Sequence, residues 1–208
     1  MYEIVQRILD GFVNCLVPEI GEEVVASSLG IAGGQQALLR QMEKLWALRL
    51  DTVVEIGTRE GIMTALLSRF ARQVISLDRD EWPQVRPVLE FVGACNVARL
   101  PLEKHEMPLL RKSLKFNLAV IGPTDRGDGA AWGFTHVKHC GRVFFRGYGA
   151  SADNLEVTRL VDSLNTGAVS RQEPFAWWSE DELDIVPCGT REILPVLERP
   201  WARRRRAK

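Results

Sequence analysis

The chain has 208 residues, of which 46% are hydrophobic and 26% are charged. This composition excludes a disordered chain, a collagen-like chain and a disulfide-stapled mini-protein, and the length suits one α/β domain. The 27 basic and 27 acidic residues give a formal net charge of zero, but residues 199–208 hold six bases and no acid. Residues 1–198 therefore carry a net charge of about −6, which disfavours nucleic-acid binding by the folded part.

Cysteine usage and hydropathy indicate a cytoplasmic protein without a membrane segment. No apolar run approaches the roughly 20 residues that a membrane helix needs. The N-terminal stretch carries Glu3, Arg7 and Asp10 and lacks the basic-then-apolar order of a signal peptide. The four cysteines are widely separated, which favours a reducing compartment and does not suggest zinc: Cys15, Cys95, Cys140 and Cys188.

Residues 1–34 are predicted to form a helical lead-in that serves as a lid, a packing element or a dimerisation element. Its apolar face is expected to contain Ile4, Val5, Ile8, Leu9, Phe12 and Val13. The main domain is expected over residues 35–198. It opens with a helix from about Gln35 that has an apolar stripe at Leu38, Met42, Leu45 and Trp46.

Strands and helices then alternate, which predicts βαβ units and a mostly parallel sheet. Strands are expected at Thr52–Ile56, Gln73–Leu77, Asn96–Leu100, Phe116–Ile121 and Arg142–Phe145, with further strands near Val169–Trp178 and Glu182–Cys188. Helices are expected from Gly61, over Gln84–Val92, over Asp128–His139, and from Asp153 with Val157, Leu160, Val161 and Leu164 on the apolar stripe.

The segment Glu55-Ile-Gly57-Thr-Arg-Glu-Gly61 joins the first of these strands to its helix. Its glycines permit a tight turn and let a ligand approach the backbone, and the new helix offers unpaired N–H groups. Asp78 follows Gly57 by 21 positions, at the end of the next strand. An acid in that place can accept hydrogen bonds from both ribose hydroxyls. Gly122 and Arg146 are expected along the same edge of the sheet.

The spacing E-x-G-x-x-x-G differs from the G-x-G-x-x-G of a dinucleotide site, which disfavours a nicotinamide-dependent oxidoreductase. An acid before the turn repels a pyrophosphate but helps to hold an amino group. Val53–Arg69, together with Val74–Asp78, resembles class I S-adenosylmethionine-dependent methyltransferases, and the resemblance extends over Gln35–Tyr148.

The resemblance implies a Rossmann-like, doubly wound sheet of seven strands and S-adenosyl-L-methionine as cofactor. It implies that Gly57 and Gly61 line the methionine part, that Glu55 lies near the amino group and that Asp78 binds the ribose. Thr58 and Gly122 complete the cofactor-binding set that it implies.

The sequence is most similar to the catechol O-methyltransferase-like group and its relatives that act on sugars and secondary metabolites. That group often has a metal-binding acid after the fourth strand and a second acid after the fifth. Here Gly122 and Gly147 stand in those places, so we predict no catalytic metal. Asp125 is the candidate base. Asp128 resembles a helix N-cap, and His136 and His139 are expected at the far end of their helix.

The expected function is metal-independent methyl transfer to an oxygen or nitrogen of a small molecule or sugar. The alternative is a non-catalytic protein of the same fold that acts as a binding or scaffolding module. Arg126 and Arg146 either bind an anionic acceptor or are exposed, and Trp132, Trp177 and Trp178 form either an aromatic wall or core. The Arg203–Arg206 tail is expected to be a disordered, solubilising end, and it alone offers a contact for nucleic acid.

Overall fold

The computed structural model describes residues 2–31, 35–78, 82–101, 115–124, 129–149, 155–165 and 167–180. The helices are α1 (Tyr2–Ile20), α2 (Glu22–Leu29), α3 (Gln36–Ala47), α4 (Ile62–Leu67), α5 (Val85–Phe91), α7 (Gly129–Val137) and α8 (Leu155–Ser163), and a 3₁₀ turn, η1 (Lys138–Cys140), follows α7. The strands are β1 (Thr52–Ile56), β2 (Gln73–Asp78), β3 (Val97–Pro101), β4 (Leu118–Ile121), β5 (Arg142–Arg146), β6 (Ala168–Gln172) and β7 (Phe175–Ser179).

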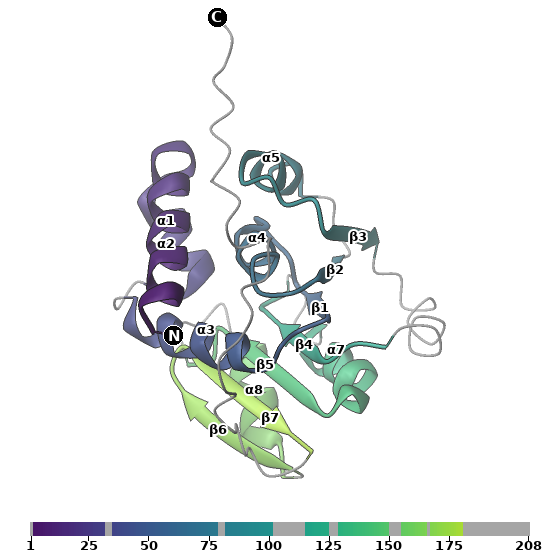
Figure 1. Cartoon of the computed structure of the whole chain (residues 1–208). Helices are drawn as coiled ribbons and strands as arrows, with labels where there is room; N and C mark the ends of the chain where they lie inside the picture. The colour runs from purple at the N-terminus through teal and green to yellow at the C-terminus, as the bar shows by residue number, and fades with distance from the viewer. Residues whose placement is uncertain are drawn as a thin grey trace, which may run out of the picture.

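The strands form one seven-stranded sheet in the order β3-β2-β1-β4-β5-β7-β6 (Figure 1). The five strands from β1 to β5 are mutually parallel, and β7 runs antiparallel to both β5 and β6. The strand order reverses between β1 and β4, which is the topological switch point of an open α/β sheet. The predicted Rossmann-like, mostly parallel sheet of seven strands is therefore confirmed.

Helices cover both faces of the sheet (Figure 1). Helices α1 to α5 pack on one face, where the core includes Val53, Val120 and Phe144. Helices α7 and α8 pack on the other face, against Val54 and Ile121. Alternate residues of the central strands thus enter different cores, and these strands read as continuous apolar runs because both faces are buried.

The apolar face predicted for α1 is confirmed apart from Ile4, with Ile8 partly buried against the same core. The residues of α1 that are buried are Val5, Leu9, Phe12, Val13 and Leu16, whereas Ile4 is 39% exposed. In α2, Val25 and Leu29 are buried in the same core as α4. The described N-terminal helices therefore pack on the sheet domain itself. Among the described residues, no helix combines the length and apolar character needed to cross a membrane.

The segment predicted as one strand near Val169–Trp178 is instead a hairpin, with β6 and β7 joined at Glu173 and Pro174. Proline cannot donate a hydrogen bond to a strand ladder, so it ends the first strand and the chain turns back. The strand expected at Glu182–Cys188 lies outside the described residues, as does the tail at residues 199–208.

Candidate functional site

The candidate site lies where the carboxyl ends of the parallel strands meet. Gly57 follows β1, Asp78 ends β2, Gly122 follows β4 and Arg146 ends β5. Because β1 and β4 are neighbours at the switch point, the loops that follow them touch each other: the N–H of Gly122 donates to the carbonyl of Ile56 at 2.9 Å. The sequence-based expectation that these four residues share one edge is confirmed. Their roles toward a ligand stay predictions.

The turn after β1 depends on two glycines in the left-handed backbone region. Gly57 has φ +84°, and a Cβ atom there would lie 2.7 Å from the carbonyl oxygen of Pro123. Gly61 has φ +79°, and a Cβ atom there would lie 2.8 Å from Cγ1 of Val85. Neither position accommodates a side chain without strain. The two glycines thus keep the backbone of this loop close to the next loop and to α5.

Glu55 is a fully buried acid beneath this loop. The hydroxyl of Thr64 on α4 donates a hydrogen bond to Oε2 of Glu55. Within the described residues Oε1 accepts no hydrogen bond, and Nη2 of Arg146 lies 3.8 Å from it. Burial raises the pKa of Glu55 to about 7, against the lowering effects of Arg146 and of Thr64. An acid in this state can hold a proton or pair with a cation near neutral pH.

The loop itself is tied to β2. The backbone N–H of Arg59 donates to Oδ2 of Asp78 at 2.9 Å. The Thr58 side chain is buried, and its hydroxyl shares a hydrogen bond with the hydroxyl of Ser76 inside the fold. If Thr58 contacts a ligand, as the resemblance to methyltransferases implies, it can therefore do so only through its backbone. Asp78 holds the loop from the side on which a ribose is expected.

Arg146 is buried and connects three elements, contrary to the expectation that it is exposed. Its side chain is only 7% exposed. The guanidinium donates from Nη2 to the carbonyl of Gly57 at 2.6 Å and from Nη1 to the carbonyl of Ser28 on α2 at 2.9 Å. It is therefore not solvent-exposed, and binding of an anionic acceptor by this buried side chain stays a prediction. Burial lowers its pKa, and the neighbouring Glu55 opposes that shift.

Gly122 leaves the space that the Arg146 guanidinium fills. A Cβ atom at Gly122 would lie 2.7 Å from both Nε and Nη2 of Arg146. An acid in this position and the guanidinium in its present place are mutually exclusive. Among the described residues, no group of three or more His, Cys, Asp or Glu side chains has the arrangement of a metal site.

The other sequence-based candidates fall into two groups. Asp125, Arg126 and Asp128 lie outside the described residues. The two histidines lie at the end of α7 and in η1, as expected: Nδ1 of His136 is 2.8 Å from the carbonyl of Trp132, and the His139 ring packs edge-on against Phe116 before β4.

The late tryptophans are core residues and do not form a shared wall. Trp177 is 2% exposed, and its indole N–H donates to Oε1 of Gln41 at 2.6 Å. Trp178 is 5% exposed and packs edge-on against Phe134 on the opposite face of the sheet. Successive strand residues face opposite sides, so the pair cannot present one aromatic surface.

Sequence reasoning missed two residues that build the site, Thr64 and Glu156. Thr64 lies in the apolar run of α4, and a polar residue in such a run is a signal for a buried partner. Glu156 lies in the first turn of α8, and its carboxylate contacts the loop after β4. No local sequence signal indicates that contact, because its partners are 26 and 32 positions away.

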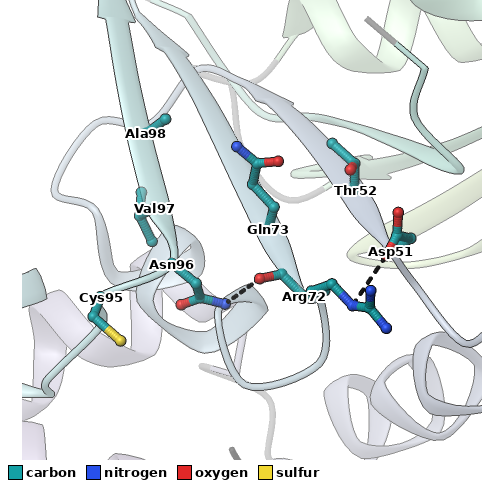
Figure 2. Close-up of a pocket in the computed structure, with 8 residues that line it drawn as sticks. All are labelled: Asp51, Thr52, Arg72, Gln73, Cys95, Asn96, Val97 and Ala98. Atoms are coloured by element: carbon teal, nitrogen blue, oxygen red, sulfur yellow. Dashed lines mark hydrogen bonds and ion pairs between the residues drawn. The ribbon is translucent and has the colours of Figure 1, made fainter.

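A separate hollow of about 410 Å³ lies at the opposite edge, at the amino ends of β1, β2 and β3. Figure 2 shows its lining side chains, among them Asp51, Arg72 and Asn96. Arg72 and Asp51 form an exposed ion pair with Nε and Oδ1 3.2 Å apart. The Asn96 amide donates to the carbonyls of Ser68 and Ala71 and so closes the turn before β2. These contacts stabilise the turns that precede the strands. The hollow lies at the amino ends of the strands and is therefore separate from the candidate site at their carboxyl ends.

Comparison with solved structures identifies the architecture. A protein from Staphylococcus aureus assigned as a caffeoyl-CoA O-methyltransferase superposes with a TM-score of 0.56 and 12% identity, over 79% of this chain and 90% of that one. The chain has the fold of the class I S-adenosylmethionine-dependent methyltransferases. By sequence, no family model and no curated protein matches the chain.

Two further structures with this methyltransferase fold show the range of activities around it. The O-methyltransferase TomG from Streptomyces achromogenes, involved in tomaymycin synthesis and solved with S-adenosylmethionine, superposes with a TM-score of 0.54 and 14% identity, over 81% of this chain and 89% of that one. An rRNA methylase from Streptococcus thermophilus gives a TM-score of 0.51 and 16% identity, over 67% of this chain and 93% of that one. At such identities the likeness extends to the methyltransferase fold alone.

Proposed function

We propose that the chain is an S-adenosylmethionine-dependent methyltransferase that needs no metal. The observation that carries this proposal is the loop at the switch point, where Gly57 lets the loops after β1 and β4 approach each other beside the buried carboxylate of Glu55 and Asp78 anchors the loop from β2. Ligands of open α/β sheets bind at this place. Oε1 of Glu55 accepts no hydrogen bond from the described residues, so an acceptor is present for an amino group.

These residues fit the cofactor by their chemistry. Gly57 and Gly61 would line its methionine part, Glu55 would accept from its ammonium, and Asp78 would accept from its ribose hydroxyls. Gly122 would form the neighbouring wall. When bound, the cofactor supplies both the methyl group and the leaving group, a neutral thioether. The work left to the chain is to orient an acceptor and to remove a proton from it. We propose Asp125 as that base, in the loop after β4.

The proposed acceptor is an oxygen or nitrogen of a small molecule or sugar. The net charge of about −6 over residues 1–198 supports this choice over a nucleic acid. Structures with this fold include enzymes of both kinds, an O-methyltransferase and an rRNA methylase. Metal independence is supported by Gly122 and Gly147, which supply no carboxylate. Location in the cytoplasm and pairing of subunits through the N-terminal helices stay predictions.

A second candidate is a non-catalytic protein that keeps the fold as a binding or scaffolding module. One observation favours it: Arg146 already donates to the carbonyl of Gly57 and lies beside Glu55, where a cofactor's ammonium would bind. A measurement of methyl transfer distinguishes the two candidates. Transfer of a labelled methyl group to any member of a panel of hydroxyl- and amine-bearing small molecules would support the enzyme.

Thermal unfolding with S-adenosylhomocysteine tests cofactor binding directly. A ligand that binds only the folded state at 100 times its Kd adds about 2.7 kcal/mol, which corresponds to a rise in Tm of about 5–10 °C for a chain of this size. Asp78→Ala should abolish the rise, and Asp162→Ala, at an exposed acid of α8, should keep it. No rise in the wild-type protein would contradict the proposal. EDTA should leave both the rise and any methyl transfer unchanged.

A further inference from the structure

Two hydrogen-bond acceptors at the switch-point loop face the same cation. The carbonyl of Gly57 accepts from Nη2 of Arg146 at 2.6 Å. The same nitrogen is the cationic neighbour of Glu55, 3.8 Å from Oε1. If a ligand brings an ammonium to this loop, its acceptors are these two oxygens. Arg146 donates a hydrogen bond to the first oxygen and lies at ion-pair distance from the second.

The guanidinium is held in this place from the far side as well. Nη1 donates to the carbonyl of Ser28, in the last turn of α2. The hydroxyl of Ser28 donates to Oε2 of Glu60 in the same loop, at 3.1 Å. Arg146 therefore connects the end of β5, the loop after β1 and the N-terminal helices. With 7% of its side chain exposed, it cannot move away without disturbing its contact with α2.

We propose that Arg146 determines which nucleosides the site accepts, because its guanidinium occupies the place of a ligand ammonium on Gly57 and Glu55. This inference rests on the proposed function. A ligand with an ammonium must displace the guanidinium, and the displaced side chain releases Ser28 and with it the end of α2. A ligand that lacks an amino-acid part enters beside Asp78 without this exchange.

Electrostatics favours the exchange. Two cations that share one carboxylate and one carbonyl repel each other, and in a buried place this repulsion is much stronger than in water. A bound ammonium therefore weakens the hold of the carboxylate and carbonyl on the guanidinium and favours its displacement. The apparent affinity of an ammonium-bearing ligand is reduced by the fraction of molecules in which Arg146 has moved away. Removing the guanidinium should therefore raise the apparent affinity for such a ligand.

Isothermal titration calorimetry of two nucleosides tests the proposal. S-adenosylhomocysteine carries the ammonium, and 5′-methylthioadenosine lacks the amino-acid part. In Arg146→Met we expect S-adenosylhomocysteine to bind at least about tenfold more tightly than in the wild type, since the competing cation is gone. The affinity for 5′-methylthioadenosine should stay within about twofold, because this nucleoside does not meet the guanidinium. Arg142→Met is the matched control, an exposed arginine at the other end of β5, and should change neither affinity.

Arg146→Met leaves Glu55 without its cationic neighbour, so the double variant Glu55→Gln/Arg146→Met provides a second protein without an unpaired buried charge. Its affinity for 5′-methylthioadenosine should also equal that of the wild type. Amide hydrogen exchange then tests whether the contact between Arg146 and the end of α2 is lost. Exchange over residues 22–29 should rise in Arg146→Met without ligand, and in the wild type on adding S-adenosylhomocysteine but not 5′-methylthioadenosine.

Three results would overturn the proposal. Weaker binding of S-adenosylhomocysteine to Arg146→Met would mean that the guanidinium holds the ligand carboxylate. Equal binding of both nucleosides to wild type and variant would mean that the guanidinium is not in the way, while the proposed function stands. Binding of neither nucleoside to any of these proteins would overturn the proposed function together with this inference.

Discussion

The carboxylate of Glu156 holds Thr124 at two points, accepting hydrogen bonds from its backbone N–H at 2.6 Å and from its hydroxyl at 3.0 Å. The second carboxylate oxygen accepts from the N–H of Ala130 in the first turn of α7, at 3.1 Å. One side chain of α8 thus fixes both ends of the segment that contains Asp125. Glu156 is a positioning residue for the loop in which we propose the base.

Replacing Glu156 should loosen this loop and lower the stability of the protein. In Glu156→Gln an amide N–H₂ group replaces one carboxylate oxygen, so a donor of Thr124 or Ala130 loses its acceptor. Such a loss costs about 1–3 kcal/mol of unfolding free energy. Urea unfolding measures the change. Asp162→Asn is the control on the same helix: its ion pair with Arg171 is exposed, with Nε and Oδ1 3.5 Å apart, and should contribute less than about 1 kcal/mol. Equal effects of the two variants would refute the positioning role.

The close approach of the two switch-point loops predicts a difference between two glycine variants. Gly57 and Gly141 have φ of +84° and +81°, but a Cβ atom meets the Pro123 carbonyl at 2.7 Å in the first and nothing within 4 Å in the second. Gly141→Ala should cost about 1–2 kcal/mol for the backbone conformation alone. Gly57→Ala should cost about 1–3 kcal/mol more, because backbone must move. Unfolding in urea gives both values, and similar costs would mean that the loops yield easily.

Gly122 and Arg146 should be energetically coupled. In Gly122→Ala the new methyl group meets the guanidinium at 2.7 Å, so we expect a loss of about 1–2 kcal/mol in the wild-type background. In the Arg146→Met background the same substitution should cost much less, since a flexible chain replaces the fixed guanidinium. A double-mutant cycle by urea unfolding measures the coupling. The control cycle with Arg142→Met should be additive, and additivity in both cycles would contradict the prediction.

The sequence was sufficient to predict the strands of the parallel core. Thr52–Ile56 reads as a strand because burial on both faces makes its residues apolar, and the structure has β1 with these same bounds. The hairpin of β6 and β7 was missed although Pro174 was visible within the run, and a proline argues against one continuous strand. On α1 the sequence predicts the buried face except at Ile4, which lies near the start of the helix and is 39% exposed.

The candidate site was predictable to the extent that it is local. Gly57 and Gly61 lie in one turn, and Asp78 ends the neighbouring strand, so spacing alone brought them to one edge. The position of the Arg146 guanidinium depends on contacts with residues 89 and 118 positions away, Gly57 and Ser28. No local pattern encodes such contacts, which is why Arg146 was expected on the surface or facing an acceptor.

The burial of Glu55 predicts a specific dependence of stability on pH. Its pKa is raised to about 7 in the folded protein from a value of 4.5 for the unperturbed group. The folded state therefore binds more protons than the unfolded state between these values, and the free energy of unfolding falls as pH rises through this window. The stabilising contribution is complete below pH 4.5 and is lost as the carboxyl ionises in its buried place near pH 7.

Glu55→Gln keeps an acceptor for Thr64 but cannot ionise, so it should lack this decline. Relative to Glu55→Gln, the wild type should lose about 2–3 kcal/mol of stability between pH 4.5 and pH 8. Urea unfolding of both proteins at a series of pH values gives the difference curve, from which the titration of all other groups cancels. Arg146 lowers the pKa of Glu55, so in Arg146→Met the decline should still begin near pH 4.5 but continue to a higher pH and be larger. A flat difference curve would show that the carboxyl of Glu55 titrates as an ordinary acid.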